Sequence, residues 1–483
     1  MRRRSSFLRA TVLGLVASTA VALTGVTPAG ADEVDGRLPA AGSVGSPGTG
    51  DDYWPLDGNG GVDVLHYDIR TGYDFGAGRL RGTTVLTLRP TQDLSRFNLD
   101  FLLPVSEVTV DGVPARHRRE RGHELVITPA RVLPQGRAVK VRVTYAGKPG
   151  TRSYAGERNW LANRHEVVTM NEPHMAPWWF PANDHPSDKA SFRIAVTVPA
   201  KKQAVANGVL VKRQRKGDRT TWVWRATEPM TSYLAFFAAG EFRLQHGRTD
   251  GRPWTLAVSE RLSRRDQRTS MRMLRRTPRL VERLERDLGP YPFGSTGGLV
   301  TSLSPGFALE NQTRPTYPAL SRHDEWLVVH ELAHQWFGNS VSLSRWSDIW
   351  LNEGAATFME VRHEELTGGR SGRAWLADMY RGHRDLDPLW KVRIGDPGPD
   401  HLFHWAVYSR GAMALQALRQ RVGEDDFWLL LRTWLADRAD GHGTTEEFEA
   451  LAEQVSGEDL DGLFDAWLRT PAKPARTAEN GLL

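Results

Sequence analysis

The sequence predicts an α+β multidomain protein in which an N-terminal antiparallel β-sheet domain precedes a mostly helical domain. Its 483 residues are enough for two or three domains, each with its own apolar core. Short β-branched and aromatic runs between turns recur over residues 53–245, which is typical of antiparallel strands. After about residue 262, the apolar residues recur at helical spacing instead. We therefore expect strands and helices to occupy successive domains.

Residues 1–31 have the three parts of an export signal. They begin with the charged stretch "MRRRSSFLRA", continue with the apolar stretch "TVLGLVASTAVALTGV", and end with the small residues "AGA". A membrane anchor is the alternative, but the apolar run is shorter than the ~20 residues that a span requires. We expect cleavage between Ala31 and Asp32, no transmembrane segment, and a secreted, extracellular protein.

Residues 32–52, "DEVDGRLPAAGSVGSPGTGDD", are rich in Gly, Pro and Ala and have no periodicity, so we expect a linker. The β domain then covers residues 53–245, with runs such as "TTVLTLRP" and "AVKVRVTYAG". The chain has no cysteine, which excludes disulfide bonds. Its stability must therefore come from apolar cores or from a bound metal.

An arginine-rich segment, residues 261–289, places its apolar residues on one face of an expected helix. These residues are Leu274, Thr277, Val281, Leu284 and Leu288. A solvated helix is the main interpretation, and a site for an anionic partner is the alternative. Without the four arginines of residues 1–31, the formal net charge falls from +6 to +2, which argues against nucleic acid as a partner.

The stretch "LVVHELAHQWFG", residues 327–338, sets polar side chains into an otherwise apolar helical pattern. Such side chains cost free energy when buried unless a partner satisfies them. His330 and His334 are four residues apart, so a helix presents both imidazoles on one face. With Glu331 they form H-E-x-x-H, two zinc ligands and a candidate general base. A pair of core histidines satisfied by the fold is the alternative.

A catalytic zinc site needs a third protein ligand and an open position. Glu353 follows His334 with 18 residues between them, enough for one helix to end and an antiparallel helix to return. Glu360 lies two helical turns beyond Glu353 and is a candidate to orient a ligand histidine. Asp348 is a rival candidate for that role. We expect one Zn²⁺ per chain.

Four segments together resemble the aminopeptidase N (membrane alanyl aminopeptidase) family of gluzincin zinc metallopeptidases. The first is "VVHELAHQWFGN" followed by "WSDIWLNEGAATFME". The others are "NEPHMAPWWFPANDHPSDKASF" (171–192), "PGFALENQT" (305–313) and "AVYSRGAMAL" (406–415). The resemblance implies a saddle-like N-terminal sheet domain, a thermolysin-like zinc catalytic domain over 246–437, and a short C-terminal helical segment and tail over 438–483.

The resemblance also implies roles for individual residues. The implied zinc ligands are His330, His334 and Glu353, the general base is Glu331, Tyr408 binds the oxyanion, Glu172 and Glu310 bind the substrate amine, and Ala308 and Asn311 belong to a substrate-binding loop. Because a peptide α-amine with a pKa near 8 is largely ammonium at neutral pH, two fixed carboxylates favour substrates with a free N-terminus. The implied reaction is hydrolysis of the first peptide bond.

The chain departs from the family pattern at several positions. Phe307 stands where the family normally has glycine, Leu309 where it has methionine, and Met170 where many members have glutamine. Little more than 60 residues follow the tyrosine-bearing segment, so we expect the large C-terminal helical domain to be missing and the site to be more open. A zinc endopeptidase and a non-catalytic exported binding protein remain alternatives. The oligomeric state and the preferred N-terminal residue stay open.

Overall fold

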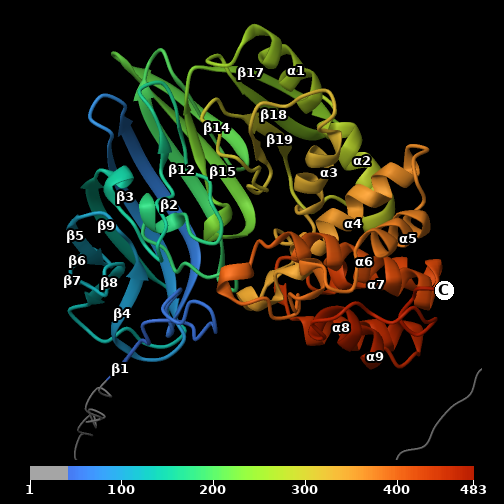
Figure 1. The fold of residues 1–483 in the computed structure, drawn as a ribbon. Coiled ribbons are helices and arrows are strands. Elements are labelled where there is room, and N and C mark those ends of the chain that lie inside the picture. Colours follow the sequence, from blue (N-terminus) through green and yellow to red (C-terminus); the bar gives the residue numbers. More distant parts are fainter. Residues whose placement is uncertain (1–41) are drawn as a thin grey trace, which may run out of the picture. The chain divides into compact units, whose positions relative to one another are not determined.

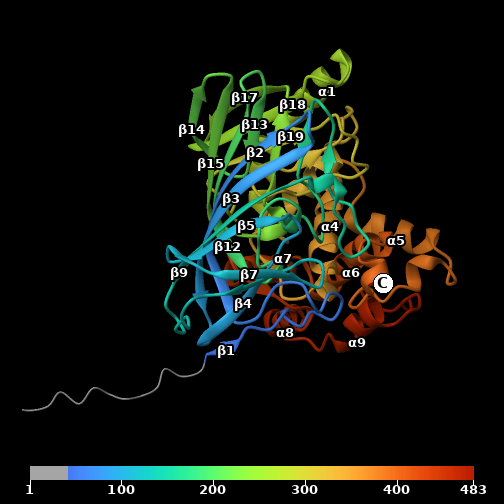
Figure 2. The same cartoon turned by 90° about the vertical axis from the view of Figure 1, so that its left-hand side faces the viewer.

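The computed structural model describes residues 42–483. The predicted export signal and residues 32–41 of the predicted linker lie outside this part of the chain. In Figure 1 the long strands lie on one side and helices α3 to α9 on the other, and Figure 2 shows the same division after a quarter turn. Among residues 42–483, no helix is both long and apolar enough to span a membrane.

The N-terminal domain is built on a sheet of eight strands. Their order is β14 (Val209–Lys216), β15 (Arg219–Thr231), β12 (Lys189–Pro199), β2 (Val62–Asp74), β3 (Arg79–Pro90), β9 (Val139–Gly147), β5 (Val105–Val110) and β6 (Val113–Pro114). Strand β9 shows why this sequence forms a sheet, because Val139, Val141 and Val143 are buried while the residues between them are exposed. The neighbouring strands are antiparallel except β2 and β12, which run parallel. The predicted antiparallel domain is therefore confirmed, with one parallel pair in this sheet and a second, β1 (Ser43–Val44) with β4 (Leu94–Asp100), in a smaller sheet.

Two smaller sheets complete this domain. One has the order β1 (Ser43–Val44), β4 (Leu94–Asp100), β8 (Glu124–Thr128) and β7 (Arg116–Glu120). The other has the order β10 (Leu161–Ala162), β11 (Val167–Val168), β16 (Phe237–Gly240) and β13 (Gln203–Ala206).

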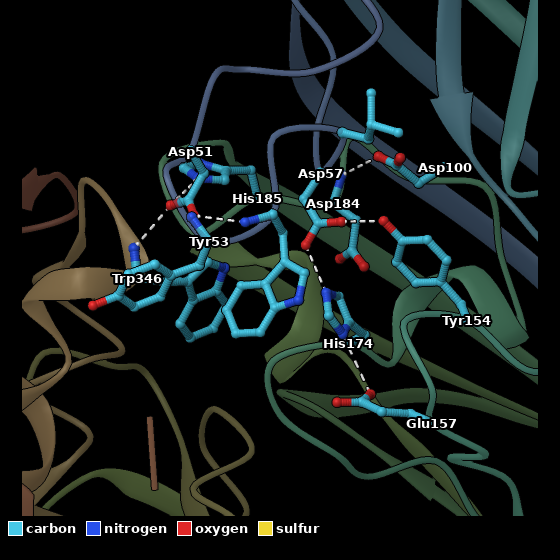
Figure 3. Close-up of polar contacts among 12 residues, drawn as sticks. Asp51, Tyr53, Asp57, Asp100, Tyr154, Glu157, His174, Asp184, His185 and Trp346 are labelled. Atoms are coloured by element: carbon cyan, nitrogen blue, oxygen red, sulfur yellow. Dashed lines mark hydrogen bonds and ion pairs between the residues drawn. The ribbon is translucent and has the colours of Figure 1, made fainter. Parts of the chain in front are cut away.

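The prediction of a linker over residues 32–52 is wrong for residues 42–52, which the structure describes. Strand β1 pairs with β4, and Asp51 is only 6% exposed. Asp51 accepts a hydrogen bond of 3.0 Å from the backbone N–H of Trp346 in the helical domain (Figure 3). The composition of residues 32–52 does not indicate that Asp51 contacts the helical domain, because its partner Trp346 lies 295 residues away in the sequence. Residues 42–52 are therefore part of the folded domain.

The second domain begins with a four-stranded sheet, earlier than predicted. Its order is β17 (Phe242–Thr249), β18 (Arg252–Ser259), β19 (Thr296–Val300) and β20 (Thr316–Tyr317). The predicted boundary at residue 245 falls inside β17, and this is a correction. Strands β16 and β17 follow each other with only Glu241 between them, so the sequence did not mark the change of sheet.

The arginine-rich segment forms two helices, not one: α1 (Arg264–Leu274) and α2 (Thr277–Leu288). Pro278 lies in the first turn of α2, where the missing N–H is tolerated and a new helix begins readily. The predicted apolar face is nevertheless confirmed, because all five of its residues are buried.

The remaining helices are α3 (Glu325–Ala333), α4 (Trp350–Leu366), α5 (Gly372–Gly382), α6 (Trp405–Val422), α7 (Glu424–Asp437), α8 (Thr445–Ser456) and α9 (Asp461–Phe464), with the short strands β21 (Ser342–Leu343) and β22 (His442–Gly443) pairing between them. Helices α3, α4 and α6 carry or adjoin His330, Glu331, His334, Glu353, Glu360 and Tyr408. Helix α4 packs against both α3 and α6. A Cβ added to Gly354 of α4 would lie 2.9 Å from the Cα of Gly411 in α6. These two glycines therefore allow a close crossing that brings Glu353 and Tyr408 to one place.

Candidate active site

The two histidines of the H-E-x-x-H motif lie on one face of the end of α3, as predicted. His334 follows the last residue of the helix, keeps helical backbone angles, and donates its N–H to the His330 carbonyl at 3.2 Å. Both side chains are buried, and their Nε2 atoms are 3.1 Å apart. The two Nε2 atoms are therefore close enough together to bind the same ion.

Glu353, in the first turn of α4, supplies the third donor. Its Oε2 lies 3.2 Å from Nε2 of His330 and 3.3 Å from Nε2 of His334. A tetrahedral zinc with bonds of about 2.0–2.1 Å separates its ligand atoms by roughly 3.4 Å. The three donors therefore fit a zinc ion by spacing and by chemistry.

The other ring nitrogens of both histidines have acceptors, which sets their tautomers. Nδ1 of His330 lies 2.7 Å from Oε1 of Glu360, and Nδ1 of His334 lies 3.1 Å from the Phe337 carbonyl oxygen. When each Nδ1 carries the proton, each Nε2 lone pair is free to bind a metal.

Glu360 and Asp348 were the two candidates for orienting a ligand histidine, and only Glu360 contacts one. Asp348 instead accepts a hydrogen bond of 2.6 Å from the Thr445 hydroxyl and pairs with Arg345. The prediction for Asp348 is wrong because this residue precedes α4 in a 3₁₀ turn and faces the start of α8.

The acidic groups of this site differ in their pKa values. Burial raises the pKa of Glu331 to about 8. Burial also acts to raise the pKa of Glu353, but the adjacent His334 and His330 outweigh it and hold that pKa at about 2. Glu353 is therefore ionised near neutral pH, whereas Glu331 binds a proton readily.

A cavity of about 740 Å³ opens over these groups. Its lining includes Glu331, Glu172, Glu310, Ala308 and Tyr408, which the sequence predicted to act on a substrate. The lining residues that sequence reasoning did not assign are Asn171, Gly306, Leu309, Pro318, Trp326, Leu327, Thr357 and Phe403. Phe307 also lines the cavity and is 40% exposed, so the side chain that replaces the family's glycine reaches this space.

Glu172 and Glu310 contribute two further carboxyl groups to the lining of the cavity. Burial raises the pKa of both, and the charge of Glu310 adds to the effect on Glu172. The Tyr233 hydroxyl donates to Oε1 of Glu310 at 3.2 Å, while Oε1 of Glu172 has no hydrogen-bond partner in the part of the chain that the structure describes. Tyr233 was missed because its position in the run "TSYLAFF" looks like one more apolar strand residue.

Asn311, which was predicted to belong to a substrate-binding loop, does not itself line the cavity. It is fully buried, and its Nδ2 donates to the Leu234 carbonyl at 3.2 Å. Backbone hydrogen bonds between Leu309 and Thr316 hold the next part of the loop. Asn311 therefore fixes the loop that carries Ala308 and Glu310.

Tyr408 reaches the site from α6. Its ring is nearly parallel to the ring of His330, with centroids 6.0 Å apart. Burial raises the pKa of its hydroxyl well above the usual value, so the hydroxyl keeps its proton and can donate a hydrogen bond.

Two family models match the chain. The peptidase M1 N-terminal domain matches residues 64–234, and the peptidase family M1 domain matches residues 298–467. The chain is 25% identical over 451 residues to Aminopeptidase M1 of Arabidopsis thaliana, covering 86% of this chain and 51% of that protein. It is 27% identical over 336 residues to the human Glutamyl aminopeptidase, covering 64% of this chain and 34% of that protein.

A crystal structure of an M1 zinc metallopeptidase mutant from Deinococcus radiodurans bound to Tyr-Ser-Ala is also similar. The TM-score is 0.77 at 28% identity, covering 89% of this chain and all of that one. By contrast, the chain spans about half the length, or less, of the curated relatives that it matches.

Proposed function

Because the chain belongs to peptidase family M1, we propose that it is a zinc-dependent aminopeptidase. It hydrolyses the first peptide bond of peptides that have a free α-amine. The observation that carries this proposal is the position of Glu172 and Glu310 in the same cavity as the ligand set His330, His334 and Glu353.

The two carboxylates select the substrate's N-terminus. A free α-amine is largely a cation near neutral pH. Among residues 42–483, neither Glu172 nor Glu310 forms an ion pair with a lysine or arginine, although burial disfavours an unpaired charge there. A substrate ammonium supplies the missing cation. A peptide bound by its amine then presents its first carbonyl to the metal ligands.

The residues around the metal divide the chemistry among them. Zinc, when bound, acts as a Lewis acid that polarises the scissile carbonyl and makes water more acidic. Glu331 takes a proton from the attacking water and delivers it to the leaving amine. The Tyr408 hydroxyl donates a hydrogen bond to the oxygen on which negative charge develops. Glu360 keeps the His330 ring oriented through the contact at Nδ1.

We also propose that the protein is exported and acts on extracellular peptides. The support is the sequence of residues 1–31, with its charged start, apolar middle and small-residue end before Asp32. N-terminal sequencing of the protein recovered from the culture medium tests this. A mature N-terminus at Asp32 is the expected result, and a cell-retained chain that begins at Met1 would contradict it.

One peptide in two forms tests the proposed activity. The rate of cleavage is measured on a short peptide with a free N-terminus and on its N-acetylated form, with and without a chelator. We expect chelator-sensitive cleavage of the free peptide only. Internal cleavage of both forms would instead indicate a zinc endopeptidase. No cleavage of several free peptides by zinc-loaded protein would favour a binding protein.

A further inference from the structure

A second set of metal-ligating side chains lies in the N-terminal domain. Asp100 ends strand β4, and His123 and Glu124 lie at the start of the neighbouring strand β8. Asp100 and Glu124 are direct partners in the register of the two strands. All three residues are about 1% exposed, and none of them lines the cavity of the candidate active site.

The acidic members of this set lack the partners that buried carboxylates normally have. Within the described part of the chain, residues 42–483, both side-chain oxygens of Glu124 and Oδ1 of Asp100 are without a hydrogen-bond partner. The Asn98 side chain lies near enough to Glu124 to offset part of its pKa shift, but no hydrogen bond of normal geometry forms. Leaving such groups unsatisfied costs several kcal/mol in an apolar interior. Three buried oxygen atoms are therefore available to one ligand.

The spacing of the atoms around His123 fits a metal ion. Its Nε2 lies 3.5 Å from Oδ1 of Asp100, 3.6 Å from Oε1 of Glu124 and 3.2 Å from the Leu56 carbonyl oxygen. These separations bracket the roughly 3.4 Å of a tetrahedral site with bonds near 2.1 Å. The three ligand atoms of the candidate active site are 3.1–3.3 Å apart in the same structure. A single proton on Nε2 can satisfy only one of the three oxygens.

The second ring nitrogen of His123 supports the same interpretation. Nδ1 lies 3.2 Å from the Arg121 carbonyl oxygen, which accepts a hydrogen bond when Nδ1 is protonated. That tautomer leaves the Nε2 lone pair free. A ligand histidine whose other N–H donates to a backbone carbonyl is the usual arrangement at metal sites.

The surrounding charges also favour a cation. Asp57 and Asp184 lie near Asp100 (Figure 3), and Asp184 donates its backbone N–H to Oδ2 of Asp100 at 2.8 Å. Among residues 42–483, no lysine or arginine forms an ion pair with Asp100 or Glu124. The nearby His174 is already paired with Asp57, because its Nε2 lies 2.6 Å from Oδ2 of that residue.

We propose that Asp100, His123 and Glu124, with the Leu56 carbonyl oxygen, bind a second divalent transition metal ion, of which zinc is the probe. Imidazole with carboxylate and carbonyl oxygen suits zinc and its neighbours better than calcium, which prefers oxygen ligands alone. The bound ion joins the N-terminal segment at Leu56 to strands β4 and β8. The role is structural, and the metal content rises from the expected one ion per chain to two.

Metal counting in full-length chains tests this proposal separately from activity. Metal-free protein is loaded with Zn²⁺, freed of excess ions by gel filtration, and analysed for zinc per chain. We expect about two ions for the native chain, about one for the H330Q/H334Q variant, and none for H330Q/H334Q/E124Q. The matched control is H330Q/H334Q/E120Q, because Glu120 lies on the neighbouring strand β7 in an exposed ion pair with Arg118. It should keep about one ion.

A second measurement does not depend on how well the E124Q variant folds. The melting temperature of H330Q/H334Q, whose second set is intact, is recorded with Zn²⁺, with Ca²⁺ and without metal. A rise with Zn²⁺ that Ca²⁺ does not reproduce supports the site. Folded H330Q/H334Q that retains no zinc and shows no rise with Zn²⁺ would overturn the proposal, and protons would then neutralise the two carboxylates.

Discussion

Oε1 of Glu360 lies 2.7 Å from Nδ1 of His330, so a carboxylate on α4 fixes the ring that the end of α3 presents to the metal. The contact sets the tautomer of His330 and adds to the basicity of its Nε2. Glu353, two turns earlier on α4, is itself one of the three donors whose spacing fits a zinc ion. One helix therefore supplies both a ligand and the group that orients another ligand.

Removing this contact should weaken metal binding. We expect Glu360→Ala to lower zinc affinity by about 10- to 100-fold, measured by competition with a chelator of known affinity. Glu364→Ala is the control, because Glu364 lies on the same helix but pairs with exposed Arg370. Equal zinc affinity in the two variants would contradict the orienting role.

Glu331 should be needed for the reaction and not for the metal. We expect Glu331→Gln to lower kcat by on the order of 10²- to 10⁴-fold, as for the loss of a general base. The zinc content of this variant should match that of the native chain, because Glu331 is not one of the three residues, His330, His334 and Glu353, whose donor atoms lie together. A variant that loses its zinc would instead place Glu331 among the ligands.

Glu310 should matter through its charge. We expect Glu310→Gln to lower kcat/KM on free-amine peptides by at least about 10-fold, because a desolvated charge pair with the substrate ammonium is lost. The ratio of kcat/KM for the free peptide to kcat/KM for the acetylated peptide should fall as well. Tyr233→Phe, which removes only the 3.2 Å hydrogen bond to Glu310, should have a smaller effect. An unchanged preference in Glu310→Gln would remove this residue from amine binding.

Tyr408 should act in the transition state more than in substrate binding. We expect Tyr408→Phe to lower kcat by about 10²- to 10³-fold with little change in KM, as for the loss of one oxyanion donor. Steady-state kinetics on one peptide measure both constants. A change confined to KM would indicate that the hydroxyl binds the substrate and does not stabilise developing charge.

The pair of His174 and Asp57 makes stability depend on pH. Burial alone lowers the pKa of a histidine, but Asp57 at 2.6 Å and Glu157 at 3.3 Å outweigh it and raise the pKa of His174 to about 10 (Figure 3). The unfolded value is about 6.5, so this stabilisation is complete below pH 6.5 and is lost as the pH rises through 10.

Chemical denaturation at several pH values measures this effect. The free energy of unfolding of the native chain should fall between pH 7 and 10.5 by on the order of 3 kcal/mol more than that of His174→Gln. Other groups titrate in the same range, and the comparison with the variant removes their contribution. Parallel curves for the two proteins would show that His174 is not held as a cation.

Much of the site could be predicted because it depends on local spacing. Residues four apart on a helix share a face, so His330 and His334 meet wherever the helix lies. Glu353 was predicted from the 18 residues that separate it from His334, and Tyr408 from the resemblance of its segment to a known family. The same local logic predicted the buried face of the arginine-rich segment, although not the break before Pro278.

The contacts that were missed are set by tertiary structure. Tyr233 and Glu310 are 77 residues apart, and no pattern in either segment indicates that they meet. Asp100 and Glu124 come together because β4 and β8 pair in that register. Asp348 was misassigned because sequence distance from the histidines says nothing about the direction in which a 3₁₀ turn points its side chain.

A time course on one peptide of about eight residues tests the central claim most directly. Zinc-loaded protein is incubated with the peptide, and the products are identified by mass spectrometry at intervals. If Glu172 and Glu310 hold the N-terminus over the metal site, the products appear in order, each one residue shorter at the N-terminus. Internal fragments at the earliest times, without released N-terminal residues, would contradict the aminopeptidase assignment.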